Sequence, residues 1–411
     1  MPAVIPISDT CLERAHMQPS PAVPSAAIMC LIALSIGVPG AALSQTEGVV
    51  VQYSNPTTPI TLGRSATRLD VGGADGVDFH RIAAILPRED GTFVVVNSGT
   101  HELRFLDAKG RVVSTAGRRG SGPGEYRDMH TAAFLPGDSI AVLDRMARRI
   151  SILDPRGTFV RSFPLAAPFE GGGSLTQMVA MANGSLVVGY SEVQRMAPQP
   201  TAVYFGQRLF AYSTTGELRS QDGLVLPATE HFVQAAPPTM GGVAYWSLAF
   251  GRVMTIRADS NALLTGDGTD WTVEERTPGG TIVRRHRLDR PVLPVTARDR
   301  DAYRTDVVAR ARAEERPVME RLAAEVPFPA TKPAYRRFET DGAGRIWLDV
   351  YPERAEADAL WIRLDPRTRR AVAVQFPSRF RPMAFTTRLV YGVWRDSDDV
   401  EHVQVFALEG L

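Results

Sequence analysis

The decapeptide GRRGSGPGEY, residues 117–126, combines residue types that often bind an anion. Its four glycines expose backbone amides that can approach a ligand closely, and Arg118 and Arg119 are adjacent cations. A nucleotide-binding P-loop also needs a lysine followed by serine or threonine, and this segment contains no lysine. It also lacks the strand-to-helix context of a dinucleotide-binding fingerprint. The segment is therefore either an anion site of another kind or a structural connection.

The sequence shows no complete catalytic or metal-binding motif elsewhere. Neither the Gly-x-Ser-x-Gly elbow nor His-Glu-x-x-His occurs. The stretch DGAGRIWLD, which begins at Asp341, lacks the ligand spacing and the closing glutamate of a calcium loop. The seven histidines are scattered without a pair at ligand spacing, so we interpret each as an ordinary polar residue. We assign no catalytic residue and no metal ligand, and we expect no cofactor.

The composition is that of a globular protein with a large core. The chain of 411 residues is 44% hydrophobic and 22% charged, with a net charge of +1. This balance gives no support for a polyanionic partner, so we expect no binding to nucleic acid. Only Lys109 and Lys332 among the 46 basic residues are lysines, a bias that we attribute to GC-rich coding rather than to a need for arginine at each site.

The N-terminus has the features of an export signal. The apolar run SAAIMCLIALSIGV covers residues 25–38, and the small residues Ala42 and Ser44 precede Gln45. We predict cleavage after Ser44, so that residues 1–44 are a signal peptide and the mature protein is periplasmic or secreted. An uncleaved anchor is the alternative, but a run of about 14 residues is shorter than the roughly 20 that span a bilayer. We therefore expect no membrane span in the mature chain.

Both cysteines lie in or before this N-terminal segment, at Cys11 and Cys30. The mature chain is therefore expected to lack disulfides, thiolate metal ligands and cysteine nucleophiles.

Two stretches of the chain repeat one another with a constant shift of 47 residues. DGTFVVVNSGTHELRFLDAKGRVV, residues 90–113, aligns without a gap with GDSIAVLDRMARRISILDPRGTFV, residues 137–160. Each copy consists of apolar and β-branched runs separated by turn residues, with an Asp-x-x-Gly turn that ends at Gly110 or Gly157. The pattern predicts a meander of antiparallel strands.

Four weaker copies follow, which makes six units. Because one such unit cannot bury both faces of its sheet, the units must stack, and units made of strands alone predict propeller blades. We predict an all-β fold over residues 45–411, a six-bladed β-propeller of four-stranded antiparallel blades. The last unit has about three strands, so an N-terminal strand near residues 58–71 is expected to complete it and close the ring. A linear solenoid is the alternative.

Two insertions interrupt the repeat. The first, Glu192–Gln207, is expected to be a loop. The second, residues 296–326, lies between units four and five and is predicted to form short helices, because Thr296 and Asp299 can make a reciprocal cap and Pro317 can open a second helix. Its charged faces are those of a solvated helix, and it is a candidate lid or partner surface.

The repeat pattern and the decapeptide together resemble the exported bacterial six-bladed β-propeller proteins of the NHL-like group. In that group a Gly-Arg-x-Gly-x-Gly-Pro-Gly-Glu-aromatic segment recurs between two early blades. The chain matches this segment at Gly117, Arg118, Gly120, Gly122, Pro123, Gly124, Glu125 and Tyr126. The resemblance implies a propeller over nearly the whole mature chain, but no single activity, because propellers include both binders and enzymes.

The 47-residue shift also gives the decapeptide a structural interpretation. It aligns Asp78, Phe79 and His80 with Glu125, Tyr126 and Arg127. Each triplet precedes the first strand of a blade, so residues 117–126 are expected to cross one propeller face between two blades. The glycines then allow sharp bends, the aromatic ring packs between blades, and the carboxylate accepts hydrogen bonds from turn amides.

The functional alternative uses the cations of the same face. Arg118 and Arg119, with His80 and Arg127 and with Glu125 beside them, could form a positive concavity for an anionic peptide, sugar or carboxylate. We therefore predict a monomeric, exported binding module without catalytic activity, whose partner is a protein, a peptide or a carbohydrate.

An enzyme remains the alternative function. Six-bladed propellers that hydrolyse lactones or phosphoesters hold calcium in the central channel with carboxylates and asparagines from several blades. The mature chain has only four asparagines, and we could not assemble such a site from the sequence. A calcium-dependent, lactonase- or esterase-like hydrolase is therefore the second candidate, with calcium as its cofactor.

Overall fold

The computed structural model describes residues 48–63, 67–73, 78–170, 173–191, 201–220, 222–235, 243–353 and 358–408. The expected signal peptide, residues 1–44, lies outside this part of the chain. Neither helix among the described residues is long and apolar enough to cross a membrane.

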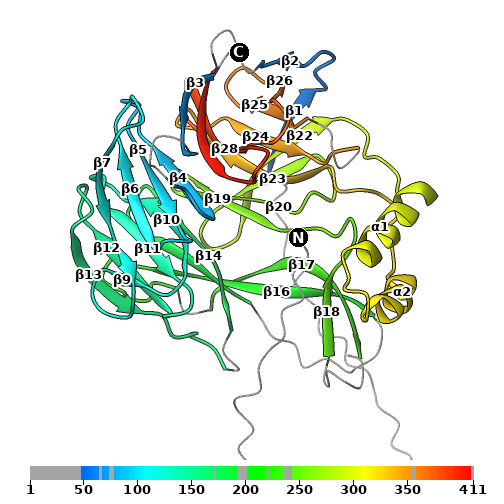
Figure 1. Ribbon diagram of the computed structural model, residues 1–411. Helices are drawn as coiled ribbons and strands as arrows, with labels where there is room; N and C mark the ends of the chain where they lie inside the picture. The colour runs from blue at the N-terminus through cyan, green and yellow to red at the C-terminus, as the bar shows by residue number, and fades with distance from the viewer. Residues whose placement is uncertain are drawn as a thin grey trace, which may run out of the picture. The chain divides into compact units, whose positions relative to one another are not determined.

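Six antiparallel sheets surround a central axis and form the predicted six-bladed β-propeller (Figure 1). The innermost strands are β4, β10, β14, β19, β23 and β27. Each of them contacts the next, and β27 contacts β4, so the ring is closed. The fold prediction is therefore confirmed, and the linear solenoid is excluded.

In every blade the strands follow chain order from the axis outwards, except for the N-terminal strands at the outer edges of blades four, five and six. Blade one contains β4 (Ile82–Pro87), β5 (Phe93–Asn97), β6 (Glu102–Leu106) and β7 (Val112–Ala116). Blade two contains β10 (Met129–Phe134), β11 (Ile140–Asp144), β12 (Arg149–Leu153) and β13 (Phe159–Pro164). Blade three contains β14 (Leu175–Ala180), β15 (Leu186–Ser191), β16 (Thr201–Tyr212), β17 (Leu224–Ala235) and β18 (Val243–Ser247).

The second half of the ring has the same order. Blade four contains β19 (Thr255–Asp259), β20 (Ala262–Gly266), β21 (Thr272–Arg276) and β22 (Ile282–Asp289). Blade five contains β23 (Tyr335–Thr340), β24 (Ile346–Val350), β25 (Leu360–Asp365) and β26 (Arg370–Gln375). Blade six contains β27 (Phe380–Phe385), β28 (Leu389–Arg395) and β29 (Glu401–Ala407).

The N-terminal strands β1 (Val49–Ser54), β2 (Ile60–Thr61) and β3 (Thr67–Val71) lie along the outer edges of three blades. Strand β3 pairs antiparallel with β29 and supplies the missing fourth strand of blade six, as predicted. Strands β1 and β2 add parallel to β22 and β26 as fifth strands of blades four and five. We did not predict these two additions, because a parallel edge strand belongs to no hairpin of the repeat.

The insertion between blades four and five forms the predicted helices α1 (Ala297–Ala309) and α2 (Arg316–Glu325) (Figure 1). Thr296 Oγ1 accepts a hydrogen bond from Asp299 N at 3.2 Å, and Asp299 Oδ2 accepts one from Thr296 N at 2.9 Å. Pro317 lies in the first turn of α2.

The expectation of a loop at Glu192–Gln207 is wrong in its second half. Residues from Thr201 onwards belong to β16, which pairs with β17 as far as Thr201 opposite Val233. The β-branched and aromatic residues of TAVYFGQRLFAY favour a strand over a loop.

The core lies between neighbouring blades. The second strands of blades one and two, β5 and β11, are buried along their whole length because other blades cover both of their faces. The repeat extends to backbone conformation. Gly110 and Gly157 have φ of 79° and 91°, and His101 and Arg148 have φ of 63° and 49°.

Candidate functional site

Residues 117–126 form the crossover from blade one to blade two, and Glu125 organises it. Glu125 Oε2 accepts hydrogen bonds from the amides of Ser121 at 3.0 Å and Gly122 at 2.8 Å, and Oε1 accepts one from Arg118 Nε at 2.9 Å. The Gly122 amide and the Arg118 guanidinium lower the pKa of Glu125. Arg149 Nη1 of β12 donates to Ser121 O at 2.8 Å and ties the turn to blade two. The charge of Arg118 is thus neutralised within the connection.

Close approach explains two glycines of the crossover. Strand β8 (Arg118–Arg119) runs parallel to β9 (Glu125–Tyr126). A Cβ atom on Gly117 would lie 2.9 Å from His101 O, and one on Gly120 would lie 2.1 Å from Glu125 Oε2. Tyr126 is fully buried in the apolar cluster between blades one and two. These contacts require glycine at both positions.

The remaining motif residues lie at the turn and at the entry to the first strands. Pro123 is exposed, and Gly124 has φ of 71°. Phe79 is buried in the cluster between blades six and one. Asp78 is exposed, and its carbonyl accepts a hydrogen bond from Arg104 Nη1 at 2.6 Å.

A polar side chain at the end of the second strand holds each early crossover. In blade one, His80 N donates to Asn97 Oδ1 at 2.8 Å, and in blade two Arg127 N donates to Asp144 Oδ2 at 2.8 Å. The corresponding bond in blade three joins Ser174 N and Ser191 Oγ at 3.1 Å. All three pairs are separated by 17 residues. Asn97 and its counterparts thus have a structural role that the repeat alignment indicates.

The candidate binding cations of the sequence, Arg118, Arg119, His80 and Arg127, have exposed side chains on the crossover face. The hollow of about 340 Å³ beside the decapeptide is lined by Gly117 and Gly124 rather than by these cations. Their role in ligand binding stays a prediction.

A larger cavity, of about 450 Å³, lies over blade five between blades four and six, and we call it the blade-five cavity. It adjoins the beginnings of β23 and β27 and the end of β24, so it opens on the same face as the crossovers. Its charged lining residues are Arg290, Arg336, Arg379, Arg381, Asp349, Glu353 and Asp358. Its aromatic lining residues are Trp271, Tyr351, Trp361 and Phe380.

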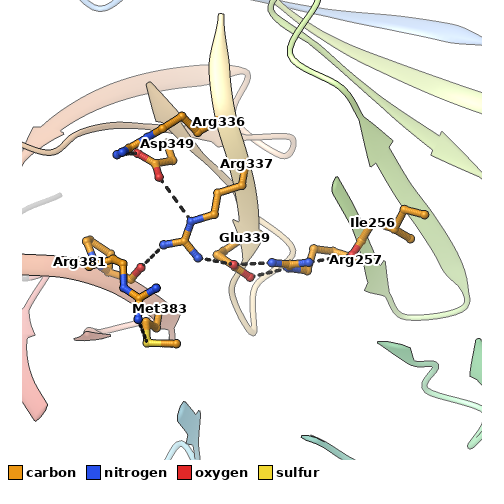
Figure 2. A network of polar contacts seen from close by, with 9 residues as sticks. Ile256, Arg257, Arg336, Arg337, Glu339, Asp349, Arg381 and Met383 are labelled. Carbon is orange, nitrogen blue, oxygen red and sulfur yellow. Dashed lines mark hydrogen bonds and ion pairs between the residues drawn. The ribbon is translucent and has the colours of Figure 1, made fainter. Parts of the chain in front are cut away.

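An ion-pair network extends from this cavity along the innermost strands of blades four and five (Figure 2). Arg336 Nη2 lies 2.8 Å and Arg337 Nε 3.4 Å from the two oxygens of the buried Asp349 carboxylate. Arg337 Nη1 lies 3.3 Å from Glu339 Oε1, and Arg257 binds both oxygens of Glu339 at 2.6 Å. These two carboxylates therefore already have arginine partners.

Arg381, on the first strand of blade six, lies beside this network without a carboxylate of its own (Figure 2). Among the described residues, the one hydrogen-bond partner of its guanidinium is Met383 Sδ, at 3.7 Å. Desolvation by the surrounding strands and the positive charge of Arg337 lower the pKa of Arg381. Part of the side chain is still open to solvent, so a ligand can reach it. The inner wall of the blade-five cavity therefore carries an arginine whose charge no described carboxylate pairs.

Arg290 is a second arginine of this kind, on the blade-four side of the cavity. Its guanidinium lies over the Trp271 ring at 5.1 Å, and Nη1 lies 3.5 Å from Asn55 Oδ1. No carboxylate of the described chain forms an ion pair with it. Burial lowers the pKa of Arg290, and the charge of Glu353 opposes this shift.

Our sequence reasoning missed these cavity residues, because they belong to the weaker repeat units. One signal was present: the first strands of blades five and six, YRRFET and FRPMAF, both carry arginine at the second position. Within the part of the chain that the structure describes, no group of three or more His, Cys, Asp or Glu side chains is arranged to hold a metal ion.

No protein-family model matches the sequence, and no curated protein sequence is similar to it. Among solved structures, the chain is similar to a Bacteroides fragilis protein described as a candidate exported protein, with a TM-score of 0.50 and 10% identity over 87% of this chain and 99% of that one. A DUF4221 family member from Bacteroides vulgatus has a TM-score of 0.48 and 10% identity over 82% of this chain and 95% of its own.

Virginiamycin B lyase from Staphylococcus aureus has a TM-score of 0.41 and 9% identity over 80% of this chain and 97% of its own. The similarity to the Bacteroides fragilis protein, at 10% identity, shows the fold alone. The chain is a six-bladed β-propeller that carries an arginine-rich cavity on its crossover face.

Proposed function

We propose that this protein is a binding propeller that takes a small anionic ligand in the blade-five cavity. The observation that carries the proposal is the guanidinium of Arg381, which lines the cavity without a carboxylate partner among the described residues. The Arg381 guanidinium is exposed to the cavity, and a carboxylate or phosphate of a ligand can supply its missing counter-charge with bidentate geometry. A volume of about 450 Å³ suits a small molecule.

The charges of the lining support an anion rather than a cation. Of the four lining arginines, only Arg336 forms an ion pair with a described carboxylate. Asp349, one of the lining carboxylates, already binds two arginines. The lining thus has an excess of positive charge that an anionic ligand would balance.

We also propose that the protein works outside the cytoplasm, as the N-terminal sequence pattern predicts. Leu293 and Pro333, which flank the helical insertion, line the cavity, and this position supports the proposal that the insertion covers a bound ligand. A protein, peptide or carbohydrate that bears an acidic group would satisfy the same chemistry.

Calorimetric titration with glutarate, benzoate and inorganic phosphate tests the proposal. We expect at least one of these anions to bind, and Arg381→Gln to weaken its binding about tenfold or more, because a charge-assisted hydrogen bond contributes about 1.5–3 kcal/mol. The double variant Arg118→Ala with Arg119→Ala is the comparison at the site proposed from sequence, and it should bind as the wild type does.

Unchanged binding by Arg381→Gln would refute the site. Loss of binding in the double variant alone would move the site to the crossover. Titration with calcium and a chelator tests the alternative function, a calcium-dependent hydrolase. A calcium-dependent rise in melting temperature together with turnover of an ester or lactone would show that the protein is an enzyme rather than a binding module.

A further inference from the structure

We infer that the ligand of the blade-five cavity is an elongated dianion, with an acidic group at each end and an apolar middle. This inference rests on the proposed function, because it takes the cavity as the binding site. It concerns the number and the separation of the negative charges of the ligand.

Apart from Arg379, whose Nη1 donates a hydrogen bond to Asp396 O at 2.8 Å, two lining arginines have no carboxylate partner among the described residues, and they come from the blades on either side of blade five. Arg381 belongs to β27 of blade six, whereas Arg290 follows β22 of blade four and leads into the helical insertion. Blade five lies between these blades in the ring, so the two guanidinium groups approach the cavity from its two sides. Neither guanidinium forms an ion pair with a carboxylate of the described chain.

We take the two arginines to bind separate negative charges, because they reach the cavity from blades four and six, which flank blade five. A compact monoanion would then pair with one of them only. Burial lowers the pKa of both arginines, as expected of cations that are partly removed from water. A ligand with two separated acidic groups pairs both.

The blade-five wall between the two cations carries both apolar and charged side chains. Its apolar residues include Ala334, Val350, Tyr351, Leu360 and Trp361. Arg336 and Asp349 form an ion pair with each other, and the carboxylates of Glu353 and Asp358 would repel negative charge along this wall. An uncharged, apolar spacer between two acidic groups fits this lining.

A chain-length series of straight α,ω-dicarboxylates, from malonate to sebacate, tests the inference by calorimetric titration beside length-matched monocarboxylates. We expect the affinity of the dicarboxylates to peak at one length and to exceed that of the matched monocarboxylate about tenfold. Arg290→Gln should remove this advantage, so that a dicarboxylate then binds no more tightly than the length-matched monocarboxylate. Arg388→Gln, at an exposed arginine in the turn after β27, is the matched control and should bind as the wild type does.

The outcomes separate this inference from the proposed function. If monocarboxylates bind as tightly as dicarboxylates, and Arg290→Gln changes neither affinity, the inference of a dianionic ligand is wrong but the proposed anion site stands. If no carboxylate binds, or Arg381→Gln has no effect on binding, the proposed function itself fails and the inference fails with it. Melting temperatures of all variants show whether a loss of binding reflects unfolding.

Discussion

Glu125 and Arg381 show how differently a charged residue can be used on the same face of this propeller. Glu125 accepts two backbone amides and one arginine, so its charge serves to fold the crossover. Arg381 lies on an innermost strand without a described carboxylate partner and lines a cavity. The presence or absence of a charged or hydrogen-bonding partner thus distinguishes the structural residue, Glu125, from the candidate binding residue, Arg381.

Gly110 gives a prediction at the scale of the residue. A Cβ atom there would lie 2.4 Å from Val71 Cγ2 and 2.8 Å from Leu69 Cδ1 of the closing strand β3. Gly137 has nearly the same φ, 78° against 79°, but a Cβ atom on it would have no described atom within 4 Å. Alanine substitutions at Gly110 and Gly137 therefore distinguish the cost of backbone strain, which both share, from the cost of contact with β3, which only Gly110 has.

We expect Gly137→Ala to lower the free energy of unfolding by about 1–2 kcal/mol through its left-handed backbone alone. Gly110→Ala should cost about 1–3 kcal/mol more, because its methyl group also overlaps with β3. Urea unfolding of both variants measures the difference. Equal losses would show that β3 does not pack against this turn.

The sequence predicted some residue roles and not others, for a physical reason. The turn glycines, Asn97 and Asp144 recur at a fixed spacing, so alignment of the repeats revealed them. No repeat pattern marks Arg290 and Arg381 in the sequence. Their candidate role rests on the folded structure, in which neither guanidinium has a carboxylate partner among the described residues. Only the packed blades show that no described carboxylate reaches them.

At the scale of the element, the helical insertion is fastened to the ring by a buried lysine. Lys332, only 6% exposed, places Nζ 2.8 Å from Asp299 Oδ1 at the start of α1 and lies over the Phe250 ring at 5.6 Å. Tyr303 of α1 packs edge-to-face on Phe328 at 5.6 Å. Asp299, which takes part in the cap of α1, therefore also anchors the insertion to the ring.

This anchor predicts a pH dependence. Burial raises the pKa of Asp299, but the hydrogen bonds from Lys332 and Thr296 outweigh it and lower the pKa to about 2. A carboxyl group whose folded pKa is lowered stabilises the fold above its unfolded pKa of about 4, and this contribution is lost as the pH falls towards 2. Asp299→Asn should therefore lower the resistance of the insertion to proteolysis at neutral pH.

The difference between Asp299→Asn and the wild type should shrink between about pH 4 and pH 2. Hydrogen exchange of α1 across this range measures it. Asp301→Asn, on the exposed side of the same helix, is the control and should behave as the wild type does at every pH. A difference that persists unchanged at pH 2 would contradict the ion pair. The sequence predicted the cap of α1 but not this anchor, because Lys332 is 33 residues away from Asp299.

At the scale of the whole molecule, the N-terminal strands hold three blades together. The sequence predicted closure of the ring by β3, because the last repeat unit lacks a strand. It did not predict β1 and β2, which pair parallel to blades four and five outside any hairpin. The blade-five cavity was likewise beyond sequence reasoning, because it is built from three blades and the roots of the insertion.

The central claim is that the ligand site of this ring is the blade-five cavity. Crystals of the protein soaked in a straight-chain dicarboxylate that carries bromine test it most directly, because the anomalous difference map locates the bromine. We predict a peak over blade five, with one carboxylate at Arg381 and the other at Arg290. A peak at Arg118 and Arg119 on the crossover, with the blade-five cavity empty, would contradict the account.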